Sequence, residues 1–419
     1  MQRNAMYPRD SMHLYRTKKD QSRRSVLSKY TILGFISSGT YGRVYKAQSK
    51  DEESRLYAIK KFKPDKEGEV VTYVGISQSA IREIALNREI NHENIVALKE
   101  VMLEDKSIYM VFEYAEHDFL QIIHHYSQTL RSQIPISVLK SVTYQLLNGL
   151  LYLHECHILH RDLKPANILI TAGGVVKIGD LGLARLTYQP LQPLFSGDKV
   201  VVTIWYRAPE LLLGAKHYNK AVDCWAVGCV IAELISLRPI FKGEEAKLDS
   251  KKNVPFQRDQ VLKIVEVLGT PSEHDWPGIR SMPEFNNILR LDKYPDTLYN
   301  WLNSRTRSPQ LYDLLTRLFK YNPDKRITAK DSLDHRWFHE EPRPHLKYVP
   351  PQRRISHDEA PTMVAMPNSQ SLSQPQSHSL LNGNGNNNSR PTSGTTFGMP
   401  MSRLASSGAT GSRKKARLE

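Results

Sequence analysis

The stretch that decides the fold of this chain is His160-Arg161-Asp162-Leu163-Lys164-Pro165-Ala166-Asn167, and Asp180-Leu181-Gly182 follows thirteen residues after Asn167. The Asp162 carboxylate can hold an attacking hydroxyl group, while the oxygens of Asn167 and Asp180 suit a hard cation such as magnesium. Transfer of a phosphoryl group requires all of these groups at fixed positions. The two segments therefore predict a site for phosphoryl transfer, which a lone His-Arg-Asp tripeptide would not do.

Further segments that such a site needs lie upstream and in order. Residues 36–44 read as a hairpin whose glycines let the backbone approach phosphates without an intervening side chain. The strand Ala58-Ile59-Lys60 presents a lysine to the phosphates, and Glu83 on the next predicted helix is the natural ion-pair partner of that lysine. The alternative, a structural histidine among capped loops, does not account for so many elements in register.

Two more segments lie downstream. Ala208-Pro209-Glu210 closes the segment that follows Asp180, and Asp223-x-Trp225-x-x-Gly228 begins a large predicted helix. Together the motifs resemble those of the protein kinases, and the likeness covers residues 30–340. The resemblance implies that Arg326, late in the chain, pairs with Glu210.

The resemblance also implies an α+β fold of the bilobal protein kinase type. A small β-rich N-lobe with one key helix is expected at residues 30–115, and a larger, mainly helical C-lobe at residues 116–340, with an ATP cleft between them. A basic arm at residues 1–29 precedes the lobes. A disordered polar and basic tail at residues 341–419 follows them, because its composition cannot bury enough apolar surface to offset chain entropy.

Specific roles follow for the site residues. Asp162 is the expected catalytic base, Lys164 steadies the transferring phosphate, and Asn167 and Asp180 are the expected magnesium ligands. The expected ATP contacts come from the hairpin, the lysine strand, the following helix, the hinge and the floor of the cleft: Ile36, Ser37, Ser38, Gly39, Thr40, Tyr41, Gly42, Arg43, Val44, Ala58, Lys60, Glu83, Glu113, Ala115 and Leu169.

Hydrophobic patterning predicts the elements that carry these residues. Strands are predicted at residues 30–37, 43–49, 55–62, 97–103 and 108–113, with one helix at about 78–91. Glu113-Tyr114-Ala115 is then the hinge, whose backbone groups hold adenine. Apolar residues share one face of a helix that ends near Cys156: Val142, Leu146, Leu150 and Leu153. Other helices are predicted near 11–27, 219–236, 257–268, 309–320 and 328–337.

The sequence resembles one subfamily of the kinases more closely than it resembles kinases in general. Ser79-Ala80-Ile81-Arg82-Glu83 and the segment at residues 201–210 resemble the cyclin-dependent kinases. That resemblance implies a cyclin that presses the Glu83 helix inward, and proline-directed serine/threonine specificity. Mitogen-activated kinases carry Thr-x-Tyr in the activation segment, whereas Thr187 and Tyr188 are adjacent here, so that relation is disfavoured.

The activation segment departs from most relatives. In the family, phosphorylation of a threonine in this segment gathers three arginines, which correspond here to Arg82, Arg161 and Arg185. Asp198 stands where that threonine is expected. A carboxylate carries less charge and fewer acceptor oxygens than a phosphate. Asp198 is therefore either a permanent, weaker substitute that needs no activating kinase, or an acidic loop residue with no role.

Asp198, the Asp180-Leu181-Gly182 sequence and the basic arm together resemble the Mediator-associated cyclin-dependent kinase 8 type, in its fungal form. The resemblance implies a cyclin C-type partner and other Mediator kinase-module subunits. It also implies nuclear residence and two substrate classes, the C-terminal repeats of RNA polymerase II and transcription factors.

Two further departures bear on activity. Ser37 replaces the first glycine of the hairpin, which restricts its closure over the phosphates. Asn87 stands where relatives usually carry leucine, in a hydrophobic column with Leu98, Leu181 and His160. A polar residue there predicts a weak column, so we expect the lone subunit to rest mostly inactive until a cyclin supplies the missing order.

Charge and composition limit the other function classes. The net charge is +15, but residues 1–30 and residues 341–419 each carry +6, so the body is nearly balanced. This distribution favours solvated or partner-binding flanks over direct nucleic-acid binding. Residues 413–417 resemble a nuclear localisation patch or are simply solvated. No apolar run suggests a membrane span, and the three cysteines are expected to be reduced and structural.

Two alternative functions remain beside an active transcriptional kinase. A largely architectural kinase-fold subunit is favoured by Ser37, Leu181 and Asn87, and disfavoured by the intact set of catalytic residues. A cell-cycle cyclin-dependent kinase is disfavoured by Asp198 and by the long tail.

Overall fold

The computed structural model describes residues 8–21, 25–38, 42–52, 55–62, 78–104, 107–187, 203–246 and 255–345. The chain divides into a compact unit at residues 1–353 and a second unit at residues 354–419. The expected tail lies outside the described residues from residue 346 onward, so its disorder stays a prediction.

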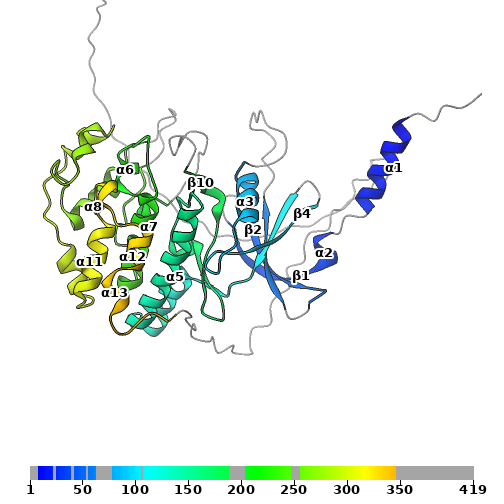
Figure 1. The fold of residues 1–419 in the computed structure, drawn as a ribbon, viewed down its shortest axis with the longest axis horizontal. Coiled ribbons are helices and arrows are strands. Elements are labelled where there is room, and N and C mark those ends of the chain that lie inside the picture. The colour runs from blue at the N-terminus through cyan, green and yellow to red at the C-terminus, as the bar shows by residue number, and fades with distance from the viewer. Residues whose placement is uncertain are drawn as a thin grey trace, which may run out of the picture. The chain divides into compact units, whose positions relative to one another are not determined.

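The small lobe is a five-stranded antiparallel sheet in the order β1-β2-β3-β5-β4. The strands are β1 (Tyr30–Ser38), β2 (Gly42–Ser49), β3 (Leu56–Phe62), β4 (Leu98–Glu104) and β5 (Ser107–Glu113). Helix α3 (Gln78–Glu89) lies beside the sheet (Figure 1), and Ala80 packs there with Phe62, Ile108 and Met110. All five predicted strands and the predicted helix are confirmed.

The N-terminal arm differs from the single helix predicted near residues 11–27. It contains α1 (Pro8–Gln21) and a separate short helix, α2 (Val26–Lys29). Ser25 begins α2 because its side chain accepts a hydrogen bond from the backbone N–H of Ser28. The N–H of Val26 donates to Glu104 at 2.9 Å, which attaches α2 to the end of β4.

The large lobe is built around two buried helices, α5 (Ile136–Glu155) and α7 (Ala221–Ser236), which lie side by side (Figure 1). The apolar face predicted for α5 is confirmed, because Val142, Leu146, Leu150 and Leu153 are all buried. The surrounding helices are α4 (Phe119–His124), α6 (Pro209–Leu212), α8 (Arg258–Leu268), α9 (Phe285–Ile288), α10 (Leu298–Asn303), α11 (Pro309–Leu318), α12 (Ala329–Leu333) and α13 (Arg336–His339).

The prediction of one helix at residues 328–337 was wrong. The chain forms α12 and α13 instead, because His335 between them has extended backbone angles (φ −71°, ψ 141°). Its ring accepts a hydrogen bond from the N–H of Trp337 and also contacts Asp313 at 2.8 Å, so His335 caps a new helix rather than continuing the old one.

Two small sheets position the catalytic segments. The strands β6 (His117–Asp118), β8 (Ile168–Ile170) and β9 (Val176–Ile178) form one sheet, and β7 (Ile158–Leu159) pairs with β10 (Arg185–Leu186) in the other. Residues 160–167 therefore lie between two fixed strands. The short turn η3 (Leu181–Leu183) follows β9 and contacts α3 of the small lobe.

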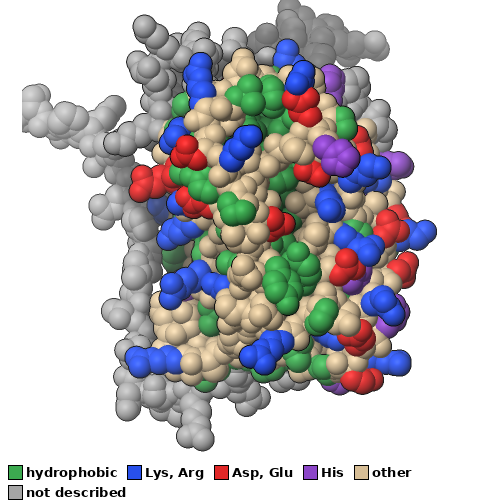
Figure 2. All heavy atoms as spheres, turned by 90° about the vertical axis from the view of Figure 1, so that its left-hand side faces the viewer, with side chains coloured by type: hydrophobic (Ala, Val, Ile, Leu, Met, Phe, Trp, Pro, Cys, Tyr) green, Lys and Arg blue, Asp and Glu red, His purple; other side chains and the backbone are tan. Residues whose placement is uncertain are grey.

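The surface and the cysteines agree with the sequence analysis. On the face shown in Figure 2, basic and acidic side chains are interspersed, as expected for a body with balanced charge. The three cysteines are free, and burial raises the pKa of the Cys224 thiol to about 12. No helix in the described part of the chain is long and apolar enough to cross a membrane.

Candidate active site

The loop that carries the candidate base is held in place by Asp223, at the start of α7. Its carboxylate accepts hydrogen bonds from the N–H groups of His160 (2.9 Å) and Arg161 (2.8 Å), and it contacts His154 Nε2 at 3.0 Å. Burial opposes the charge on Asp223, but these contacts outweigh burial and lower the pKa of the carboxyl group. They also support the left-handed backbone of Arg161 (φ 68°), which is unfavourable for a residue with a side chain.

Asp162 is fixed by two neighbours in the same loop. Lys164 Nζ lies 2.7 Å from Asp162 Oδ2, and the Asn167 amide nitrogen donates to the same oxygen at 2.9 Å and to the Asp162 carbonyl at 2.8 Å. The structure therefore brings three predicted site residues together. Because the Asn167 amide nitrogen is committed to Asp162, its oxygen is the group left to serve as a metal ligand.

Lys60 joins the two lobes. Its Nζ atom lies 2.8 Å and 2.9 Å from the two carboxylate oxygens of Glu83 and 2.9 Å from Asp180 Oδ1. Burial opposes the lysine charge, but the two carboxylates outweigh burial and raise the pKa of Lys60. Burial also opposes the charge on Asp180, yet Lys60 lowers the pKa of that carboxyl group below its ordinary value. The predicted pair of Lys60 and Glu83 is thus present, and it extends to a predicted magnesium ligand.

His160 links the catalytic loop to the segment with Asp180. Its Nε2 atom lies 2.9 Å from the carbonyl oxygen of Gly179, and the N–H of Asp162 donates to Nδ1 at 3.2 Å. One neutral tautomer, protonated at Nε2, satisfies both contacts. The Asp180 backbone is left-handed (φ 58°), which turns its carboxylate toward Lys60.

Two of the arginines expected to bind an anion contact η3. Arg82 donates to the carbonyl oxygen of Gly182 at 2.8 Å, and Arg161 donates to that of Leu183 at 2.6 Å. Arg185 follows in β10, two residues after Leu183. Asp198 lies outside the described residues, so its contact with this group stays a prediction.

The described residues expected to contact phosphates lie at the adjoining ends of β1 and β2. Ile36, Ser37 and Ser38 end β1 and Gly42, Arg43 and Val44 begin β2, with Ser37 opposite Val44. Gly39, Thr40 and Tyr41 lie outside the described residues. A glycine at position 42 is also required by packing, because a Cβ atom there would clash with the carbonyl oxygen of Lys61 in β3. Close approach of two strands therefore requires this glycine.

The residues expected to contact adenine come from four separate parts of the chain. Ala58 lies in β3, Glu113 ends β5, Ala115 follows in the hinge, and Leu169 lies in β8 of the large lobe. The N–H of Glu113 donates to the carbonyl oxygen of Ala97 at 3.0 Å. The structure thus places the predicted adenine contacts on elements of both lobes, where their contact with adenine stays a prediction.

The predicted pair of Arg326 and Glu210 is confirmed. The two side chains form parallel hydrogen bonds of 2.7 Å and 2.9 Å, and both are almost completely buried. Arg326 also donates to the carbonyl oxygen of Ala221 at 2.8 Å and lies over the Trp225 ring. This pair fixes the end of the activation segment against α7.

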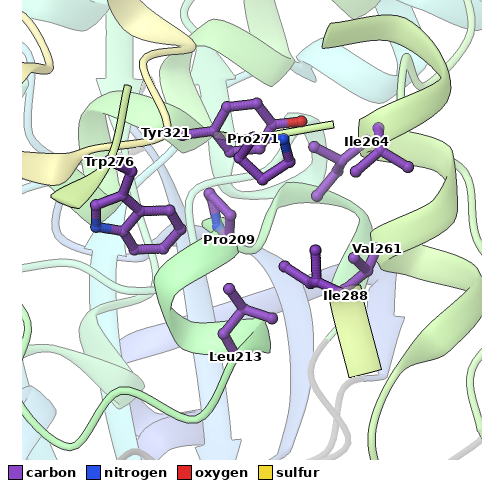
Figure 3. A pocket seen from close by; sticks show the side chains of 9 residues that line it. Pro209, Leu213, Val261, Ile264, Pro271, Trp276, Ile288 and Tyr321 are labelled. Atoms are coloured by element: carbon purple, nitrogen blue, oxygen red, sulfur yellow. The ribbon is translucent and has the colours of Figure 1, made fainter. Parts of the chain in front are cut away.

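A second hollow in the large lobe is not a competing site. It is lined by apolar side chains from α6, α8, α9 and nearby loops, as Figure 3 shows: Pro209, Leu213, Val261, Ile264, Val265, Pro271, Trp276, Ile288 and Tyr321. Tyr321 supplies the only side-chain oxygen, and its hydroxyl donates to the carbonyl of Gly269 at 2.7 Å. A hollow without convergent charged groups cannot perform acid–base or metal chemistry.

The donor set fits magnesium bound together with ATP. No group of three or more His, Cys, Asp or Glu side chains forms a metal cluster within the described residues. Magnesium at a nucleotide site typically takes one or two carboxylates and relies on phosphate oxygens for the rest. Asp180 and Asn167 meet that requirement.

Three residues that contact residues of the candidate site were missed by reasoning from sequence. They are Asp223 as the clamp of the catalytic loop, Tyr218, whose hydroxyl accepts from Arg161 at 3.0 Å, and Lys177, which pairs with Glu113 at 2.8 Å. The sequence did contain a signal for Lys177, because this lysine is the only charged residue in the apolar run Val175-Val176-Lys177-Ile178. A lone charge in a buried strand requires a partner.

Comparison with known proteins agrees with this geometry. The protein kinase domain family matches residues 30–338. The serine/threonine-protein kinase Ssn3 of Aspergillus terreus is 59% identical over 337 residues, which cover 76% of this chain and 78% of that protein. The Ssn3 kinase of Yarrowia lipolytica is 57% identical over 354 residues, which cover 83% of this chain and 87% of that protein.

A solved structure is also similar. The crystal structure of the yeast RNA Pol II CTD kinase CTDK-1 complex contains a chain that is 34% identical, with a TM-score of 0.65, covering 78% of this chain and 98% of that one. The predicted bilobal fold is therefore confirmed.

Proposed function

Because the chain belongs to the protein kinase family, in which it is an ATP-dependent serine/threonine kinase of the cyclin-dependent kinase 8 (Ssn3) type, we propose that it acts on transcription with a cyclin C-type partner. The proposed substrates are the C-terminal repeats of RNA polymerase II and transcription factors. The proposed setting is the Mediator kinase module in the nucleus. Asp198, the Asp180-Leu181-Gly182 sequence and the basic arm support this narrower assignment.

The observation that carries the activity is the joined set of Lys60, Glu83 and Asp180, together with an Asp162 side chain fixed by its neighbours. ATP with magnesium supplies the transferable phosphoryl group and neutralises its charge when bound. Asn167 and Asp180 would hold the metal, and Lys60 would orient the phosphates. Asp162 accepts the proton of the substrate hydroxyl, while the adjacent Lys164 ammonium offsets the charge on the transferring group.

A cyclin-type partner is supported by the exposed side of α3. Ile81 lies in the Ser79–Glu83 motif and is 53% exposed, although it is a large apolar residue. The same helix carries Glu83 and Arg82. A partner that covers Ile81 would therefore bear directly on the helix that completes the site.

The architectural alternative is supported by Ser37, Leu181 and Asn87, and a test must separate it from catalysis. The experiment is a magnesium-ATP assay on a polymerase C-terminal repeat peptide, with and without cyclin C, beside Asp180→Ala. We expect cyclin-dependent transfer that the substitution abolishes and that phosphatase pretreatment leaves intact, since Asp198 replaces a phosphothreonine. A stable cyclin complex without transfer would favour the architectural function.

A further inference from the structure

The rear of the hinge contains an ion pair that the catalytic mechanism does not use. Lys177 in β9 lies 2.8 Å from Glu113 Oε1, and their side chains are only 11% and 23% exposed. The same Glu113 oxygen accepts a hydrogen bond from the N–H of Ala97 at 2.7 Å. One carboxylate thus joins the hinge, the segment before β4 and a strand of the large lobe.

A second set of contacts, made of hydrogen bonds, joins the segment before β4 to β9. Before β4, the N–H of Val96 donates to the carbonyl oxygen of Ile178 at 2.9 Å, and the N–H of Ile178 donates to that of Asn94 at 2.8 Å. The side chain of Asn94 also donates to the carbonyl oxygen of Val176 at 2.9 Å. Residues 94–97 are therefore bound to β9 on both sides of Lys177.

The ion pair and these hydrogen bonds lie between two parts of the expected ATP site. Glu113 is the hinge residue whose backbone is expected to face adenine, and Lys177 precedes the metal ligand Asp180 by three residues. Lys177 also lies opposite Leu169, the expected floor of the adenine site, in the β8–β9 pair. The ion pair consequently connects the hinge to the strand that leads to Asp180.

We propose that Glu113 and Lys177 are positioning residues for ATP, which hold the hinge backbone in register with the metal ligand. Removing the Lys177 charge leaves a partly buried carboxylate without its cation and frees the hinge to shift. Adenine then binds to a hinge that must first be ordered, which weakens nucleotide binding. Asp162 and Lys60 keep their own contacts, so the chemical step is preserved.

This inference deepens the proposed kinase function and rests on it. The test uses the entire chain. Adenosine and ADP binding are measured by calorimetry for wild type, Lys177→Met, Glu113→Gln and the double variant. We expect each single variant to weaken adenosine binding about tenfold, and the double variant to be no worse than either. Lys177→Arg, which keeps the charge, should recover most of the loss.

Kinetics of the complex with the cyclin-type partner provide a second readout. Lys177→Met should raise the KM for ATP about tenfold and leave kcat within about twofold. Lys263→Met is the matched control, because Lys263 pairs with Glu266 at 3.0 Å in α8, remote from the hinge, and should change neither constant.

The outcomes separate this inference from the kinase function. Adenosine binding in Lys177→Met that equals wild type would overturn the inference and leave the kinase assignment intact. A higher kcat at unchanged KM would also overturn it, because the pair would then restrain the lobes rather than position ATP. Failure of the wild-type chain to bind any adenine nucleotide would overturn ATP use itself.

Discussion

The Asn87 side chain donates a hydrogen bond to the backbone carbonyl oxygen of Glu83, one turn earlier in α3, at 2.7 Å. Asn87 is 7% exposed, and α3 packs against the η3 turn that contains the buried Leu181. Its amide nitrogen is therefore satisfied within its own helix. A leucine would instead extend apolar contact toward the large lobe.

Replacement of Asn87 by leucine should raise the activity of the kinase without cyclin. A gain of about 1 kcal/mol in apolar packing corresponds to about fivefold more of the ordered state. Peptide phosphorylation by the lone subunit measures it, with Arg88→Leu on the exposed side of α3 as the control. Equal cyclin-free activity in Asn87→Leu and wild type would contradict the prediction.

Neighbouring lysines in β3 should differ sharply in importance. Lys60 contacts Glu83 and Asp180, whereas the Lys61 ammonium group lies over the Tyr109 ring. Lys60→Met should lower kcat on the order of 100-fold, because a preorganised charge at the phosphates is lost. Lys61→Met, which changes the same type of residue one position away, should retain activity. Comparable losses in the two variants would refute the assignment.

The Arg326–Glu210 pair should matter for stability far more than an exposed pair. Arg326→Met leaves the Glu210 carboxylate buried without its partner, which should lower the free energy of unfolding by about 3–5 kcal/mol. Lys263→Met removes half of a pair whose side chains are each 36% exposed, and should cost less than about 1 kcal/mol. Urea-induced unfolding measures both, and similar losses would contradict this ranking.

Asp223 should make stability depend on pH in the acid range. Its pKa in the folded chain lies below the ordinary value of 3.8, so its contribution is fully present above that value and is lost as the pH falls through the folded pKa. Asp223→Asn should therefore be less stable than wild type by about 2 kcal/mol near neutrality. The difference should shrink below about pH 4. A difference that stays constant down to pH 3 would show that the charge is not the cause.

Much of the fold follows from local pattern. The five strands, α3 and the buried face of α5 were predicted within a few residues, because alternation and helical spacing are readable within short windows. The candidate catalytic residues were equally accessible from the sequence. Phosphoryl transfer accepts few side-chain types, and Asp162, Asn167 and Asp180 occur at a characteristic spacing. The contact of Lys60 with Glu83 was expected from two other segments, Ala58-Ile59-Lys60 and the start of the predicted helix that carries Glu83.

Other features could not be read from the sequence. The break between α12 and α13 depends on Asp313, more than twenty residues away from His335 in the chain. The need for Gly42 arises from the carbonyl oxygen of Lys61 on a neighbouring strand, not from the phosphates alone. Both are consequences of approach between distant segments, which no window of sequence contains.

The sequence by itself therefore determined the order of elements and the chemistry of the cleft, since both depend on residue type and local spacing. Only the tertiary structure decided which groups support that chemistry. Asp223 is bound to the catalytic loop, and Lys177 to Glu113, across more than sixty residues of chain. Such pairs form only where folding brings the two segments together and excludes water, so that a buried charge must find its partner.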